Sequence, residues 1–116
     1  MKVVRATRAL VINELRRYAR VPMASRAIIE TSAGRFPVMT VEVSAGGLSV
    51  CSPATISVKD SVSVSLTLPG QQRFSVRAFL CWERKGADKV YGLRFDPSDN
   101  VRLRIRTWID QQLEIV

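Results

Sequence analysis

The chain has 116 residues, of which 47% are apolar and 24% are charged, so it is long enough for one folded domain and too apolar to be largely disordered. It carries 18 Lys and Arg residues against 10 Asp and Glu residues, a net charge of +8. This excess favours an anionic partner such as nucleic acid, a nucleotide or an acidic membrane surface, although a basic surface can also serve solubility alone.

Most of the positive charge lies in the first 35 residues, which hold eight basic and two acidic residues and so account for +6 of the +8. Residues 3–18 contain helix formers without Gly or Pro but only a ragged apolar stripe, which predicts a helix that ends before Pro22. We therefore divide the chain into a basic N-terminal arm over residues 1–20 and a folded body over residues 21–116.

The folded body begins with short strand patterns separated by turn residues. Residues 61–68 alternate strictly between hydroxyl and apolar side chains, which predicts a strand with its valines and leucines facing the core. From Phe74 to Trp82 the large apolar residues alternate in the same way, so both of these aromatic residues are expected on one face. Strands are predicted over residues 27–29, 36–43, 48–51, 61–68, 74–82 and 90–95.

The chain ends with a helix pattern. Asp96-Pro97-Ser98-Asp99 is typical of a helix start, because Pro fits the first turn and acidic residues face the positive end of the helix dipole. Apolar residues then recur at helical spacing up to Leu113, which predicts an amphipathic helix packed on the sheet. Together the patterns predict a small all-β protein, a six-stranded antiparallel β-barrel with a C-terminal α-helix.

The chain lacks the residues that common catalytic and metal sites need. It has no histidine to act as general base, and neither a GxxxxGK[ST] loop nor a GxGxxG fingerprint. Its two cysteines, Cys51 and Cys81, are far apart and have no accompanying zinc ligands. We predict no enzymatic activity, no metal and no cofactor. The absence of a signal-peptide pattern and of a membrane-length apolar run predicts a cytoplasmic protein without membrane insertion.

A first candidate binding segment is the arginine run that ends the N-terminal arm. Arg16 and Arg20 are four residues apart, which places them on one side of the backbone in either a helix or a strand, and Arg17 adds charge. A guanidinium group pairs with phosphate, recognises the O6/N7 edge of guanine and stacks on bases. The alternative is a solvated helix end whose arginines face its negative C-terminus.

A second candidate segment is Glu42-Val43-Ser44-Ala45-Gly46-Gly47, at the end of a predicted strand. The Ser44 hydroxyl can both donate and accept hydrogen bonds, and the two glycines allow positive φ and close approach of a ligand to the backbone. The alternative is an ordinary glycine turn between strands.

Taken together, about 22 residues apart, the two segments resemble the PilZ domain family of bacterial cyclic di-GMP receptors. That family has an RxxxR motif just before its barrel and a [D/N]xSxxG motif on an early strand. Arg16 and Arg20 match the first motif, and Ser44 and Gly47 match the second. Where the family has Asp or Asn, this chain has Glu42, whose side chain is one methylene longer.

This resemblance covers roughly residues 14–112, including Tyr91–Ser98, which is similar to the closing strand and helix start of the family. It implies the six-stranded PilZ barrel and cyclic di-GMP as the ligand. It also implies that the arginines grip guanine edges and phosphates, that Glu42 and Ser44 hold a second guanine edge, and that Gly47 lets the ligand lie close to the strand. The site residues implied are Arg16, Arg17, Arg20, Glu42, Ser44 and Gly47.

We predict that the ligand draws the N-terminal arm into an ordered position and so creates a surface for an effector protein, which the sequence does not identify. One alternative is a protein-interaction module of the same fold that has weakened or lost its ligand through Glu42, at a cost of about ten- to a hundredfold in affinity. Another is a nucleic-acid-binding barrel. Aromatic residues make up only 7% of the chain, and Tyr18 alone lies in the basic run, so we predict no specific nucleic-acid partner.

Overall fold

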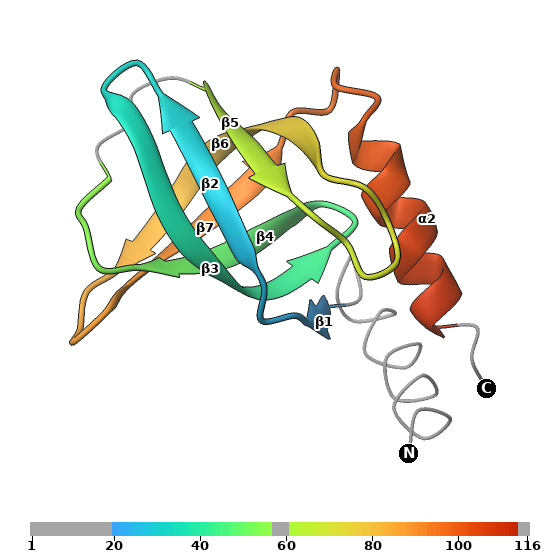
Figure 1. The fold of residues 1–116 in the computed structure, drawn as a ribbon, viewed down its shortest axis with the longest axis horizontal. Coiled ribbons are helices and arrows are strands. Elements are labelled where there is room, and N and C mark those ends of the chain that lie inside the picture. Colours follow the sequence, from blue (N-terminus) through green and yellow to red (C-terminus); the bar gives the residue numbers. More distant parts are fainter. Residues whose placement is uncertain (1–19, 57–60, 114–116) are drawn as a thin grey trace.

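The computed structural model describes residues 20–56 and 61–113, which form strands followed by one helix (Figure 1). The helix expected over residues 3–18 lies outside the described residues. In chain order the elements are β1 (Arg20–Pro22), β2 (Arg26–Thr31), β3 (Gly34–Ser44), β4 (Gly47–Ser52), β5 (Ser61–Leu66), β6 (Phe74–Arg84), β7 (Lys89–Phe95) and α2 (Arg102–Leu113).

Six of these strands close into a barrel. Each neighbouring pair is antiparallel, in the order β3-β2-β5-β6-β7-β4, and pairing of β4 with β3 completes the ring. This confirms the predicted six-stranded antiparallel barrel. The sequence patterns did not predict β1, whose three residues pair with β3 from Glu42 to Ser44, beyond the part of β3 that pairs with β2.

The barrel interior is filled by the apolar side chains that strand alternation turns inward. Val62, Val64 and Leu66 of β5 are buried, whereas the serines between them are only half-buried on the outer face. The strand was expected to reach Leu68 but ends at Leu66. The chain turns just beyond the strand, at residues 68–71, where the Gln71 amide donates to the Leu68 carbonyl and Gly70 adopts a φ of 78°.

Tyr91 is the largest fully buried side chain in the barrel, and its hydroxyl fastens the connection after β4. The Tyr91 hydroxyl accepts a hydrogen bond from the Ile56 amide at 2.9 Å and lies 3.5 Å from the carbonyl oxygen of Ala54. Burial raises the pKa of Tyr91 above its usual value of 10.0, because the ionised phenolate would lose its hydration. The residue therefore stays neutral at physiological pH and serves as a structural anchor.

Replacing Tyr91 with phenylalanine should lower the free energy of unfolding by about 1–3 kcal/mol, because the buried Ile56 amide would lose its hydrogen-bond partner. Urea denaturation followed by circular dichroism measures this loss. Phenylalanine keeps the ring and creates no large cavity. A variant as stable as the wild type would show that the loop finds other partners.

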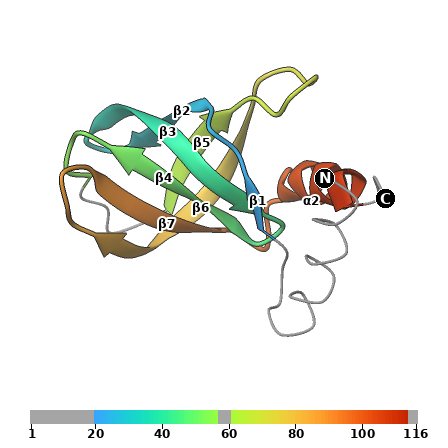
Figure 2. The ribbon, with the colours of Figure 1, turned by 90° about the horizontal axis from the view of Figure 1, so that it is seen from below.

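Helix α2 lies outside the barrel, at the end that carries the β3–β4 turn (Figure 2). Its buried residues Ile105, Trp108 and Ile109 recur at helical spacing, as predicted for an amphipathic helix. The helix begins at Arg102, just after the Asp96–Asp99 signature, and Asp99 caps its start, since the Asp99 carbonyl also accepts from the Arg102 amide at 3.2 Å. One Asp99 carboxylate oxygen accepts from the Arg77 amide of β6 at 2.8 Å, and the other accepts from the Val101 amide at 3.0 Å.

Within residues 20–56 and 61–113, no helix is long and apolar enough to cross a membrane.

Candidate functional site

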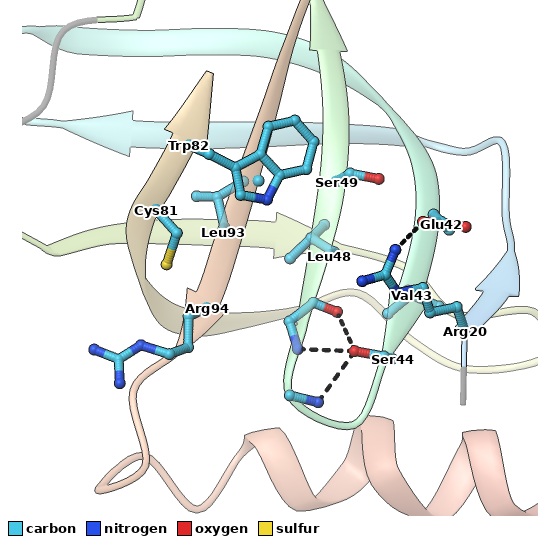
Figure 3. A pocket seen from close by; sticks show the side chains of 13 residues that line it. Arg20, Glu42, Val43, Ser44, Leu48, Ser49, Cys81, Trp82, Leu93 and Arg94 are labelled. Atoms are coloured by element: carbon cyan, nitrogen blue, oxygen red, sulfur yellow. Dashed lines mark hydrogen bonds and ion pairs between the residues drawn. The ribbon is translucent and has the colours of Figure 1, made fainter. Parts of the chain in front are cut away.

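A pocket of about 350 Å³ opens on the outer surface of the barrel beside the β3–β4 turn (Figure 3). It lies between β1 and the end of β3 on one side and β6 and β7 on the other, with the start of β4 between them. The sheet order explains this arrangement, since β4 pairs with both β3 and β7, and β7 pairs with β6. The volume is at the lower end of the range of small-molecule sites.

Arg20 and Glu42 form an ion pair at the edge of the pocket. Arg20 is opposite Ser44 in the β1–β3 register, and Glu42 is opposite Pro22, so the two charged residues are diagonal neighbours. The Arg20 guanidinium nitrogen lies 3.3 Å from the Glu42 carboxylate, with side chains 56% and 38% exposed. An ion pair this exposed contributes little to stability, so both groups can exchange partners at low cost.

Ser44 holds the β3–β4 turn in shape. Its hydroxyl accepts hydrogen bonds from the amides of Gly46 and Gly47, each at 3.2 Å, and lies 3.2 Å from the Gly47 carbonyl oxygen, to which it donates (Figure 3). The Ser44 hydroxyl therefore forms hydrogen bonds with backbone groups of the turn, and Ser44 also lines the pocket.

Gly47 is required by the packing of the barrel itself. A Cβ atom at this position would collide with the carbonyl oxygen of Leu93 on β7, because β4 and β7 approach each other closely there. The two glycines could adopt positive φ but do not use this freedom: in the described part of the chain the glycines with positive φ are Gly34 and Gly70. Close approach at Gly47 is real, but the group that approaches is the neighbouring strand.

Trp82 forms the opposite wall of the pocket, and the sequence analysis missed it. The alternation from Phe74 onward places Trp82 on the core-facing side, but its side chain is 49% exposed and lines the pocket. The register of β6 against β7 shifts between Leu80 and Trp82, and one extra residue reverses the facing of those that follow. The expected inward position of Trp82 is therefore wrong.

The indole of Trp82 rests on bare backbone. Trp82 is opposite Gly92 in the β6–β7 register, and a Cβ atom on Gly92 would occupy the position of the indole ring. A tryptophan followed ten residues later by a glycine on the next strand is the sequence signal that could have indicated this contact.

Arg94 of β7 adds a second cationic group to the pocket lining. Its side chain is exposed, and its guanidinium carbon lies 5.5 Å from the centre of the Phe79 ring, a cation–π distance. Figure 3 shows Arg94 and Arg20 on opposite sides of the β3–β4 turn. With Glu42 as the acidic member, the lining has a positive balance that attracts anions.

The fold thus brings Arg20, Glu42, Ser44 and Gly47 together at one pocket, although the arginine is 22 residues away from Glu42 in the chain. The other two predicted site residues, Arg16 and Arg17, lie outside the described residues. No group of three or more potential metal ligands occurs in the part of the chain that the structure describes.

Comparison with known proteins places this geometry in context. A model of the PilZ domain matches residues 14–111. No curated protein matches the chain in sequence.

Among the solved structures that share the fold are the following three. The Bacillus subtilis inhibitor of motility MotI/DgrA has a TM-score of 0.69 and 14% sequence identity, and the match covers 84% of this chain and 50% of that chain. Escherichia coli YcgR in complex with c-di-GMP has a TM-score of 0.66 and 17% identity, with 85% of this chain and 46% of that chain covered. The PilZ domain of E. coli YcgR with c-di-GMP has a TM-score of 0.64 and 16% identity, with 84% of this chain and 92% of that chain covered. The chain spans about half the length of the first two proteins.

Proposed function

Because the chain belongs to the PilZ domain family, we propose that it is a receptor for cyclic di-GMP and that the pocket beside the β3–β4 turn is its binding site. The observation that carries the proposal is the convergence of the two motif segments. Arg20 from the end of the arginine run and Glu42, Ser44 and Gly47 from the second segment line the same pocket. A tryptophan and a second arginine face them from β6 and β7.

Each of these groups suits one part of a guanine dinucleotide. The Arg20 guanidinium can pair with a phosphate or with the O6/N7 edge of guanine, and the Glu42 carboxylate can accept hydrogen bonds from guanine N–H groups. The half-exposed Trp82 indole offers a flat surface on which a base can stack, a contact that contributes about 1–3 kcal/mol per base in single-stranded nucleic-acid complexes. Arg16 and Arg17 add positive charge from the adjoining arm in this proposal.

We propose further that binding is the whole activity, with no reaction catalysed. The ligand draws the N-terminal arm against the pocket, and the arm together with the ligand forms the surface that an effector protein recognises in the cytoplasm. A ligand can shift such an equilibrium only through contacts that differ between the two states, and the arginines of the arm provide them. Isothermal titration of the full chain with cyclic di-GMP tests the proposal, with GTP as the control ligand. Failure to bind cyclic di-GMP would refute it.

The Arg20–Glu42 ion pair favours a second candidate function. In the free protein the Arg20 guanidinium is paired with the Glu42 carboxylate, so this carboxylate competes with the ligand for Arg20. A chain in which this competition prevails is a protein-interaction module that docks on its partner without cyclic di-GMP.

Shortening Glu42 to aspartate separates the two functions. The shorter side chain is expected to release Arg20 from an exposed ion pair worth up to about 1 kcal/mol, so a receptor should bind cyclic di-GMP up to about fivefold more tightly in the Glu42→Asp variant than in the wild type. The matched control is Glu30→Asp, because Glu30 also pairs with an arginine, Arg35, at 3.9 Å but lies outside the pocket. If neither the wild type nor Glu42→Asp binds, the receptor function is refuted and the interaction module is favoured.

A further inference from the structure

Thr40 is a polar residue buried inside an apolar barrel. It is 2% exposed, and the next inward-facing residues of β3 on either side, Val38 and Val43, are also buried. A buried hydroxyl without partners is costly, so its hydrogen bonds should reveal why it is there.

The backbone around Thr40 is irregular on both edges of β3. On one edge, three residues that connect β1 to β2, Met23 to Ser25, lie opposite only two residues of β3, Thr40 and Val41. The Met23 amide donates to the Val41 carbonyl at 3.0 Å, and the Thr40 amide donates to the Ser25 carbonyl at 2.8 Å. On the other edge, the register with β4 shifts between Thr40 and Glu42. An extra residue in a ladder leaves backbone groups without their usual partners.

The Thr40 hydroxyl supplies those partners. It accepts a hydrogen bond from the Ser25 amide at 2.9 Å and donates its single proton to the Met23 carbonyl, with the Ser25 carbonyl at 3.2 Å as a further acceptor. One side chain on β3 therefore holds both ends of the three-residue segment that connects β1 to β2.

This connection determines where Arg20 lies. Within the described residues, β1 is three residues long and is paired on one edge only, with β3. The exposed Arg20–Glu42 ion pair contributes too little to fix the strand. The contacts just after β1, at the buried Met23 and the half-buried Ser25, add to the pairing of β1 with β3 and hold the strand in place.

We propose that Thr40 is a positioning residue for the ligand site: it fixes β1 against β3 and thereby holds the Arg20 guanidinium at the pocket without touching the ligand. This inference rests on the proposed function for its binding readout, but its structural part can be measured in the free protein. Thr40 does not line the pocket, so any effect of its substitution on binding is indirect, and exchange of the Met23 amide reports whether the end of β1 is released.

The test replaces Thr40 with valine, which keeps the side-chain shape and removes the hydroxyl, and with serine, which keeps the hydroxyl. The affinity for cyclic di-GMP is measured by titration. The rate of hydrogen exchange at the Met23 amide is measured by NMR in the absence of ligand. We expect Thr40→Val to bind about tenfold more weakly and to exchange the Met23 amide faster, and Thr40→Ser to recover both properties. The matched control is Ser52→Ala, which removes another buried hydroxyl that bonds backbone, to the Ala54 amide at 3.1 Å, outside the pocket.

Unchanged affinity in Thr40→Val, or equal losses in Thr40→Val and Ser52→Ala, would overturn the inference, because the effect would then be absent or merely one of general stability. If the wild type does not bind cyclic di-GMP, the proposed function fails and the exchange data decide alone. Loss of Met23 protection in Thr40→Val, but not in Ser52→Ala, would still support the positioning role. Unchanged protection would overturn it.

Discussion

Replacing Arg20 with alanine should weaken cyclic di-GMP binding about a hundredfold, because the proposed contacts of its guanidinium are hydrogen bonds between charged groups, worth about 1.5–3 kcal/mol each. The same change should leave the free energy of unfolding within about 0.5 kcal/mol of the wild type, since the side chain is 56% exposed and its only ion pair among the described residues is with Glu42. Isothermal titration gives the affinity, and urea denaturation gives the stability.

Two further variants show what Arg20 contributes. Arg35→Ala is the matched control, because Arg35 is also exposed and paired with a glutamate, Glu30, but lies outside the pocket. It should bind like the wild type. Arg20→Lys should fall between the wild type and Arg20→Ala, since lysine retains the charge but not the planar fork. Equal affinity in the wild type and in Arg20→Ala would remove Arg20 from the site and, with it, the main support for the pocket.

Replacing Gly47 with alanine should lower the free energy of unfolding by about 2–3 kcal/mol even without ligand. The added methyl group would collide with the Leu93 carbonyl, which belongs to a backbone paired on both sides in the barrel and cannot move aside cheaply. Urea denaturation of the ligand-free protein measures this loss.

Gly86→Ala is the matched control for this substitution. Gly86 follows β6, and a Cβ atom there would meet only the Asp88 carbonyl oxygen at 3.5 Å, an ordinary van der Waals distance. Its stability should stay within about 0.5 kcal/mol of the wild type. Wild-type stability in Gly47→Ala, combined with weaker ligand binding, would instead mean that the missing side chain makes room for the ligand.

The barrel was predictable from sequence because most of its strands have a residue pattern that can be recognised within each strand. Strict alternation in residues 61–66 and buried apolar positions at helical spacing in α2 follow from one-sided burial, which leaves a period in the sequence. Strand β1 leaves no such period. It has only three residues, one of them Pro22, and forms because β3 extends beyond β2 and offers an unpaired edge.

The candidate site was predictable only where a motif marks it. Arg20 and the segment from Glu42 to Gly47 were found because their spacing resembles that of a family, and the structure places them at one pocket. Trp82 was missed because a bulge reverses its facing. The role of Ser44 in bonding the turn and the role of Gly47 in admitting β7 depend on contacts that composition does not reveal.

The basic charge, the alternating strands and the C-terminal helix follow from the amino-acid sequence alone, because each is a property of residues close together in the chain. In contrast, the shared lining of the pocket, the contact of Arg20 with Glu42 and the outward position of Trp82 are visible only in the folded structure. These outcomes depend on the register between paired strands, and a shift of one residue in that register turns a side chain from the core to the surface.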